Sequence, residues 1–398
     1  MNGPADAAAQ ARAERDGRLA ALDFDRAPFV IAWELTRACA YACAHCRADA
    51  QPQRDRGELT TAEALGLVDD LAGFGNRPIL VLTGGDPLMR RDVFEIAAHA
   101  DRRGLRVALT PTATALTTPA RMVEARSVGV RRVAFSLDAP VPRLHDRFRG
   151  FRGSFERTLA GIEAAAEAGL PLQINTTACA QNGDSLKYMV PLIAELGAVQ
   201  WSVFFLVPIG RGRRLAMLSA HGHERLIRWL DDAAAELPFD VKITAAPQHR
   251  RIALEGSGEG PLAGAGYRFA DGLRRPAKGV NDGRGFMFVS HRGEVMPSGF
   301  LPITAGRVPR ESAVDLYRDS PLFRAMRDPE RLTGKCGICE YREVCGGSRA
   351  RAYAVSGDSL GPDPSCPYQP AQPGPASSPS AASSSSATAS GGGPPGTP

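Results

Sequence analysis

Three cysteines, Cys39, Cys43 and Cys46, lie close together in the segment WELTRACAYACAHCRADA. Their spacing, Cys-x3-Cys-x2-Cys, lets three thiolates converge on one soft metal centre. A closed zinc or cubane site normally has four protein ligands, so the triplet is one ligand short. It predicts either zinc with a distant fourth ligand, such as His45, or an iron–sulfur cube with one iron open to a substrate or cofactor.

A second group of cysteines lies near the C-terminal end. Cys336-x2-Cys339-x5-Cys345 is followed by Cys366 twenty-one positions later. Four thiolates can complete either a structural zinc site or a fully ligated 4Fe-4S cluster. The eighth cysteine, Cys179, stands alone, and we expect it to be a small buried hydrophobe.

The elements that must position the triplet alternate between strands and helices. The expected strands are Phe29–Thr36, Ile79–Thr83, Arg106–Thr110, Arg132–Leu137, Pro171–Thr176 and Trp201–Val207. The expected helices have apolar residues at helical spacing: Ala62–Phe74, Asp92–Arg103, Ala120–Val128, Phe155–Ala168 and Leu186–Leu196, with a sixth at His223–Leu237. Thr60 with Glu63 predicts a capping box, and Thr118-Pro119 predicts a helix start.

Six βα units in series predict an α/β fold with a parallel sheet and right-handed crossovers, either a partial barrel or an open sheet. In both, chemistry belongs at the carboxyl ends of the strands. The triplet follows the first strand at that end, and TGGDP (83–87) follows the second. We therefore expect these two segments to form one site.

The rest of the chain changes character. We predict a flexible N-terminus over residues 1–25, a barrel over 26–240, an irregular connection over 241–282, a small Cys-rich domain over 283–370 and a disordered low-complexity tail over 371–398. Residues 283–302 predict a β-hairpin that turns at His291, Arg292 and Gly293.

Composition limits the protein class. No apolar run is long enough to span a membrane, and the N-terminus has no secretory apolar region. We therefore expect a cytoplasmic protein whose cysteines serve metal binding or catalysis. The net charge of +5 arises mainly from arginine. No basic stripe with interleaved aromatic residues is present, so we expect no nucleic-acid partner and no membrane partner.

The triplet after the first strand resembles the signature of the radical S-adenosylmethionine (SAM) superfamily, over residues 25–215 and 283–368. The resemblance implies a partial (β/α)6 TIM-like barrel. It also implies a catalytic 4Fe-4S cluster held by the three cysteines, whose open iron binds SAM, and a 5′-deoxyadenosyl radical that abstracts hydrogen. An electron donor such as flavodoxin or ferredoxin is then required. No catalytic acid or base can be named.

The same resemblance implies residues that contact SAM. Gly84, Gly85 and Asp86 match a Gly-Gly-Glu-Pro motif at which the backbone meets the methionine amino group, although the acid here is Asp. His45 matches a position that packs near the adenine. Ser136, Asp138 and Asn175 match positions that face the cofactor, as does VPIGRG (207–212). The competing interpretation for each is an ordinary polar residue at a strand end.

The C-terminal cysteines resemble the SPASM extension, which carries auxiliary clusters in this superfamily. Its pattern is Gly-x4-Cys, a gap, Cys-x2-Cys-x5-Cys-x3-Cys, a gap and a last Cys. Here Ser298 and Arg349 replace two of those cysteines. Both belong to the first auxiliary cluster of the family, so the resemblance implies one auxiliary 4Fe-4S cluster, with four protein ligands and an electron-relay or structural role.

For the substrate, the triplet segment, the single auxiliary set and CGGSRARAYA (345–354) resemble the haem and haem d1 biosynthesis branch. That branch acts on propionate side chains of tetrapyrroles, and arginine suits such polyanions. One alternative is maturation of a ribosomally made peptide. A hypothesis from another class is a non-catalytic zinc or iron–sulfur regulator.

Overall fold

The structure of the chain is a computed structural model that describes residues 23–234, 236–257, 267–268, 274–275, 279–371 and 396. Its centre is a ten-stranded sheet in the order β12-β11-β10-β1-β2-β3-β4-β5-β6-β7. The strands from β1 to β7 pair in parallel and in chain order, as successive βα units should. They are β1 Val30–Thr36, β2 Ile79–Gly84, β3 Arg106–Leu109, β4 Val130–Ser136, β5 Leu172–Ala178, β6 Gln200–Phe205 and β7 Asp240–Thr244.

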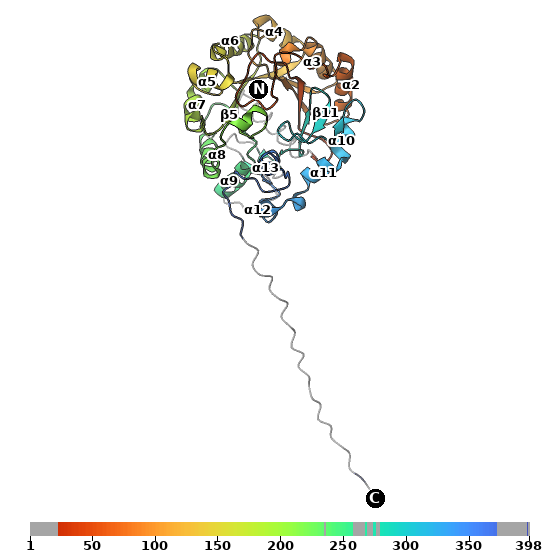
Figure 1. Cartoon of the computed structure of the whole chain (residues 1–398), viewed down its shortest axis with the longest axis vertical. Coiled ribbons are helices and arrows are strands. Elements are labelled where there is room, and N and C mark those ends of the chain that lie inside the picture. The colour runs from red at the N-terminus through yellow and green to blue at the C-terminus, as the bar shows by residue number, and fades with distance from the viewer. Residues whose placement is uncertain are drawn as a thin grey trace, which may run out of the picture.

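Helices surround the strands as an outer ring (Figure 1). They are α2 Thr61–Ala72, α3 Val93–Arg102, α4 Pro119–Ser127, α5 Pro142–Arg149, α6 Ser154–Glu167, α7 Met189–Glu195, α8 Ala220–Ala234 and α9 Gln248–Ser257, with 3-10 turns η1 Pro87–Met89, η2 Gly183–Tyr188 and η3 Gly210–Arg214. The predicted capping box is confirmed, because the Thr60 side chain accepts from Glu63 N and the Glu63 carboxylate from Thr60 N. Pro119 begins α4 as predicted. No helix of the described part is long and apolar enough to cross a membrane.

Side chains alternate between two faces of the sheet. Ile31, Trp33 and Leu35 of β1 are fully buried in the main apolar core, whereas Glu34 is a buried carboxylate between them in sequence. Since successive side chains of a strand point to opposite faces, Glu34 lies on the face opposite the apolar residues. The same alternation in β4 and β5 places Ser136 and Asn175 on the polar face. The polar face is therefore where the strands can carry a site.

The C-terminal part continues this sheet. The predicted hairpin is present as β10 Phe286–Val289 and β11 Glu294–Met296, with Gly293 at the turn in a left-handed conformation (φ 82°). β10 pairs in parallel with β1, and the short strand β12 Gly306–Arg307 completes the edge. Helices α10 Ala313–Asp319, α11 Pro321–Arg327, α12 Gly334–Gly337 and α13 Arg349–Ser356 follow, with η4 Pro329–Arg331.

Two differences from the sequence prediction affect the site. The described residues contain a seventh parallel strand, β7, followed by α9, where we expected an irregular connection over 241–282. They also contain α5, for which we predicted no element. The short pair β8 Tyr267–Arg268 and β9 Arg274–Arg275 also falls in the connection. The predicted flexible N-terminus and low-complexity tail lie almost wholly outside the described residues.

Candidate functional site

The triplet lies in a closed loop that begins directly after β1. The loop is held at its base, because Cys39 N donates to Gln51 O (2.8 Å) and Gln51 N donates to Arg37 O (3.0 Å). Cys39 and Cys43 are buried, whereas Cys46 is half-buried. The strand end thus positions all three thiols within one short, internally bonded segment.

The thiols of this loop already have polar neighbours. Tyr41 N donates to Cys39 Sγ and Ala50 N donates to Cys46 Sγ, each at 3.4 Å. Burial raises the pKa of Cys39 and raises the pKa of Cys43 to about 11. A thiol with such a pKa becomes a thiolate near neutral pH only when a metal takes the place of the proton, so metal binding here releases protons.

Two glycine turns brace the loop from other elements. Gly150, which ends α5 with φ 66°, lies so close that a Cβ there would be 2.6 Å from Ala42 O. Gly210, at the start of η3 with φ 51°, would place a Cβ 2.5 Å from Cys46 O. Both positions combine a left-handed backbone with close backbone contact, which only glycine accepts without strain.

Arg211 fastens the same loop by hydrogen bonds. Its backbone N–H donates to Cys46 O (3.0 Å), while Nε donates to Cys43 O and Nη1 to Ala50 O, both at 2.9 Å. One residue of the VPIGRG segment therefore holds three carbonyls along the loop. Its role in supporting the loop was not part of the sequence prediction.

The glycine turn after β2 packs directly against the triplet segment. Gly85 N donates to Thr36 O (2.7 Å), and a Cβ on Gly85 would lie 2.3 Å from Ala38 O. Gly84 has φ 146° and would place a Cβ 2.3 Å from Thr36 O. Both glycines are therefore required by the close packing of the two strand ends, which brings the two segments together as predicted.

Asp86 faces into the protein. Its carboxylate accepts from Leu88 N (3.2 Å), Thr112 N (3.4 Å) and Thr114 Oγ1 (2.6 Å), and it is fully buried. Thr112 in turn donates to Gly85 O (2.6 Å) and accepts from the Cys39 thiol (3.9 Å). Asp86 thus fixes the shape of the turn that supports the triplet.

A set of buried polar groups lies beside the triplet. The His45 ring stacks on Phe148 with ring centroids 4.6 Å apart, and burial lowers the pKa of His45 to about 4. Asp138 Oδ2 lies 3.9 Å from His45 Nε2 and 3.6 Å from Arg149 Nη1, which is too far for good hydrogen bonds. His45 Nδ1, Asp138 Oδ2 and Arg149 Nε are buried without a hydrogen-bond partner. Unpaired buried polar atoms at one place are the pattern expected where a polar ligand binds.

The other predicted strand-end residues lie side by side. Ser136 of β4 and Asn175 of β5 are register partners, and both are half-buried. The other carboxylate oxygen of Asp138, Oδ1, accepts from Thr177 N of β5 (2.9 Å). The carboxyl ends of β4 and β5 therefore present three neighbouring polar residues, of which Asp138 lies near His45 of the triplet loop. Direct contact of Ser136 or Asn175 with the cysteines is not observed among the described hydrogen bonds.

Sequence reasoning missed the contribution of α5. This helix supplies Phe148 against His45, Arg149 against Asp138, and His145 Nδ1, which accepts from Asp138 N (3.2 Å). The segment VPRLHDRFRG has Pro142 in its first turn and Gly150 as the left-handed C-cap, which are a helix start and stop signal. Those signals could have identified the helix, although it has only eight residues.

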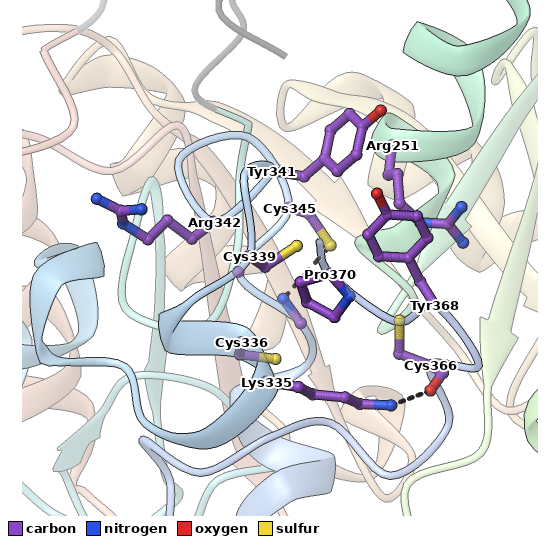
Figure 2. A pocket seen from close by; sticks show the side chains of 12 residues that line it. Arg251, Lys335, Cys336, Cys339, Tyr341, Arg342, Cys345, Cys366, Tyr368 and Pro370 are labelled. Atoms are coloured by element: carbon purple, nitrogen blue, oxygen red, sulfur yellow. Dashed lines mark hydrogen bonds between the residues drawn. The ribbon is translucent and has the colours of Figure 1, made fainter. Parts of the chain in front are cut away.

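The four C-terminal cysteines line one pocket. Figure 2 shows Cys336, Cys339, Cys345 and Cys366 arranged around a common space. Burial raises the pKa of Cys339 to about 11, that of Cys345 to about 12, and also that of Cys366. The chain therefore brings all four predicted ligands together.

The two positions that lack the family's cysteines belong to one hydrogen-bonded region. Ser298 lies after β11 and contacts the carboxylate of the half-buried Asp282, which also accepts from Ala350 N (2.9 Å). Arg349, next to Ala350, is almost fully buried, and its Nη2 donates to Cys336 Sγ (3.7 Å). Polar side chains therefore take the place of the two missing thiols.

The eighth cysteine, Cys179, lies apart from both groups. Cys179 is fully buried, as expected, and its N–H and thiol both donate to Asn182 Oδ1. Across the described ranges, no three His, Cys, Asp or Glu side chains converge closely enough to hold a single metal ion. Neither cysteine group, as the described residues place it, therefore converges on a single point.

Comparison with known proteins identifies relatives along most of the chain. The model of the radical SAM superfamily matches residues 33–195. The AdoMet-dependent heme synthase of Methanosarcina barkeri is 43% identical over 87% of this chain and 98% of its own length. The pre-heme d1 synthase of Dinoroseobacter shibae is 29% identical over 87% and 88%, and the PqqA peptide cyclase of Ruegeria pomeroyi 28% over 86% and 88%.

Among solved structures, SuiB of Streptococcus suis bound to S-adenosylmethionine has a TM-score of 0.66 at 14% identity. The match covers 92% of this chain and 84% of that one. This similarity shows the fold: an α/β architecture with a largely parallel sheet.

Proposed function

The chain belongs to the radical SAM superfamily of enzymes, and from this we propose that it oxidatively modifies a side chain of a haem-type tetrapyrrole. The observation that carries the proposal is the 43% identity to a heme synthase along 98% of that relative. Identity falls to 28% for the peptide cyclase. An excess of arginine, within a net charge of +5, also suits a substrate with several carboxylates.

The triplet fits a catalytic 4Fe-4S cluster. Cys39, Cys43 and Cys46 are soft ligands on a loop held at its base and on both flanks, and a cube held by three cysteines keeps one iron for another ligand. When bound, the cluster and SAM supply a 5′-deoxyadenosyl radical that abstracts hydrogen from an unactivated carbon. We propose flavodoxin or ferredoxin as the class of electron donor.

The neighbouring residues fit SAM. The unpaired atoms of His45, Asp138 and Arg149 are available to a ligand with both amino and carboxylate groups. Gly84 and Gly85 let the backbone after β2 pack against residues 36–38 and so hold this turn beside the triplet, and Ser136 and Asn175 lie on the polar face of the sheet. Asp86 serves the site indirectly, because its carboxylate is used by Leu88, Thr112 and Thr114.

The C-terminal quartet fits an auxiliary 4Fe-4S cluster. A tetrahedral zinc site requires sulfurs about 2.3 Å from one ion, and hence close to one another. The four cysteines line one pocket, yet among the described residues their side chains do not converge closely enough to hold a single ion. In a cubane each thiolate binds a different iron, so this arrangement supports the cluster. Because the protein supplies all four ligands, no iron is open to bind the substrate. We therefore assign this cluster an electron-relay or structural role.

Anaerobic reconstitution with a substrate panel tests the proposal. The protein is incubated with SAM, dithionite and either an iron tetrapyrrole bearing propionates or a short precursor-type peptide. We expect 5′-deoxyadenosine to form in proportion to a mass loss in the tetrapyrrole only. Turnover of the peptide alone would move the assignment to peptide maturation, which the 28% identical relative makes the second candidate. A colourless, zinc-containing protein that leaves SAM intact would support a non-catalytic regulator.

A further inference from the structure

Arg349 occupies an unusual position for a positive charge. Its side chain is buried, and the guanidinium donates to three backbone carbonyls: Gly347 O (3.2 Å), Ser359 O (3.1 Å) and Gly361 O (2.7 Å). The other terminal nitrogen of the guanidinium, Nη2, donates to Cys336 Sγ at 3.7 Å. Arg349 forms no ion pair with a carboxylate in the described part of the chain.

The surrounding carboxylates are engaged elsewhere. Asp363 is buried with Arg351, whose Nη1 donates to Asp363 Oδ2 at 3.0 Å. Asp282 accepts from Ala350 N, and burial raises the pKa of its carboxyl group. Both carboxylates act on Arg349 at longer range, but neither forms an ion pair with it. The guanidinium directly contacts the Cys336 sulfur, and an anionic centre there would compensate a buried cation.

Lys335 provides a second cation at the same pocket. It precedes Cys336 in α12, lines the pocket, and its Nζ donates to the carbonyl of Cys366, as Figure 2 shows. The two cations therefore contact two of the four cysteines. Arg349 contacts the sulfur of Cys336, and Lys335 contacts the backbone of Cys366.

The glycine next to Arg349 makes its contact possible. Gly347 has φ 64°, and a Cβ there would lie 2.6 Å from Arg349 Nη2 and 3.2 Å from Cys336 Sγ. A side chain at residue 347 would separate the guanidinium from the sulfur. The chain thus combines a left-handed glycine, a buried arginine and a cysteine in one contact.

We propose that Arg349 and Lys335 are fixed cations that raise the reduction potential of the auxiliary cluster. Adding one electron makes a thiolate-ligated cubane more negative by one unit, and a nearby fixed positive charge stabilises the more negative form. Hydrogen bonds to ligand sulfurs and net charge are among the factors that set such potentials. A cysteine at residue 349 would contribute the opposite charge.

This inference rests on the auxiliary cluster proposed above, and it deepens that proposal by assigning the cluster the role of electron acceptor. The buried Arg349 replaces a neutral or negative group with a positive one, which favours the reduced state. Both residues are positioning residues, because they act through the cluster and do not contact the substrate.

The test isolates the auxiliary cluster in the full-length chain. Cys39→Ala, Cys43→Ala and Cys46→Ala together remove the catalytic triplet, so that about four irons should remain per chain. The midpoint potential of the remaining cluster is then measured by redox titration with EPR detection. Zinc without iron in this protein would refute the auxiliary cluster itself, and with it the inference, before any arginine variant is made.

In this background, Arg349→Gln should lower the midpoint potential by about 59 mV. For a one-electron reduction, this corresponds to a tenfold change in the equilibrium constant. Arg349→Lys keeps the charge and should shift it less. Lys335→Gln should shift it in the same negative direction. Arg342→Gln is the matched control, because Arg342 lines the same pocket, points away from the sulfurs in Figure 2 and donates to Glu330. It should shift the potential much less than Arg349→Gln or Lys335→Gln, because its charge is already paired with Glu330 near the surface.

The outcomes separate an electrostatic role from a purely structural one. If Arg349 only ties the loops at Gly347, Ser359 and Gly361 together, Arg349→Gln will lower iron content or thermal stability while the loaded fraction keeps the wild-type potential, and the proposal is wrong. If Arg349→Gln does not load iron, the half-buried Lys335 decides the matter. A Lys335→Gln potential equal to that of Arg342→Gln would contradict the proposal.

Discussion

At the scale of single residues, the site depends on groups that have no functional atoms of their own. Gly85 contributes only its lack of a side chain, because the backbone of residues 37 and 38 lies where a Cβ would be. Asp86 contributes a carboxylate that never leaves the interior of the turn. The chemistry of the cysteines therefore depends on how closely two strand ends can approach.

Gly85→Ala should disrupt that approach. The new Cβ would lie 2.3 Å from Ala38 O and 2.8 Å from Arg37 O, and backbone atoms cannot rotate away. We expect a loss of about 1–3 kcal/mol in unfolding free energy, as for other overpacked sites, and at least tenfold weaker SAM binding by equilibrium dialysis. Gly66→Ala is the control, since nothing lies within 4 Å of that position in α2. It should stabilise the chain by roughly 0.5–1 kcal/mol.

His223 predicts a dependence of stability on pH. The His223 ring is buried against Phe205, and this burial lowers the pKa of His223 to about 4. The positive charge of Arg351 lowers the pKa further, whereas the negative charge of Asp363 opposes the shift. Between pH 6.5 and 4 the unfolded chain holds a proton on this ring that the folded chain lacks. The contribution of His223 to stability should therefore be fully present above pH 6.5 and fall as the pH decreases, by up to about 1.4 kcal/mol per pH unit. The buried His45 and His145, whose pKa values are also lowered to about 4, add to the same slope.

Urea titrations at a series of pH values measure this effect. His223→Gln should make the slope between pH 6.5 and 4 shallower, whereas substitution of the exposed His221 on the same helix should leave the slope as in the wild type. An identical slope in wild-type protein and His223→Gln would contradict the assignment.

At the scale of elements, the triplet loop is a strand-end loop held by its neighbours on both sides. α5 and Gly150 brace one side, and η3 with Gly210 and Arg211 braces the other. The hydrogen bonds that Arg211 donates to the loop all go to backbone carbonyls and leave the sulfurs free for a metal. The loop can therefore present three thiols in a defined arrangement without the rigidity of a regular element.

Arg211→Gln should loosen the loop while leaving its ligands intact. Two side-chain hydrogen bonds to Cys43 O and Ala50 O are lost, each contributing about 1 kcal/mol or more because the donor is charged. We expect the iron of the triplet to be lost several-fold faster on exposure to a chelator. Arg213→Gln, at an exposed neighbour in η3, should behave as the wild type. Equal rates in both variants would show that the clamp does not support the loop.

The elements that sequence reasoning identified are those with strong local signals. Thr60 with Glu63, and Thr118 with Pro119, mark helix starts that the structure confirms. α5 was missed because a helix of eight residues gives too short an apolar period to be recognised. The pairing of β10 with β1 could not be predicted, since it joins residues more than 250 positions apart and no local pattern encodes it. Tertiary contacts also decide the direction of Asp86, which the motif alone left open.

At the scale of the whole molecule, one sheet connects the two cysteine groups. β10 pairs with β1, the strand that leads into the triplet, and Arg351 of α13 joins the quartet region to the barrel. Its guanidinium donates to Asp363 and, through Nε, to Leu206 O beyond β6 (3.4 Å), and it also donates to Ala245 O beyond β7. The C-terminal part is therefore built into the barrel edge.

Breaking the buried Arg351–Asp363 pair should destabilise the whole chain. Asp363→Asn removes the negative charge that pairs with Arg351, whose side chain is 0% exposed. Leaving such a buried charge uncompensated lowers the unfolding free energy by about 3–5 kcal/mol. The exposed pair Arg324–Asp319 is the matched control, and Asp319→Asn should cost at most about 1 kcal/mol. Chemical denaturation followed by circular dichroism measures both. Similar losses in the two variants would show that the buried pair does not hold the parts together.

The central claim is that the two cysteine groups hold two separate iron–sulfur clusters, with SAM chemistry at the triplet. Iron and SAM cleavage measured together on three anaerobically reconstituted proteins test it most directly. The wild type should bind about eight irons and cleave SAM. The Cys39/Cys43/Cys46→Ala protein should bind about four and cleave none, and the Cys336/Cys339/Cys345/Cys366→Ala protein should keep about four at the triplet. Zinc at the quartet, or SAM cleavage that survives loss of the triplet, would contradict the account.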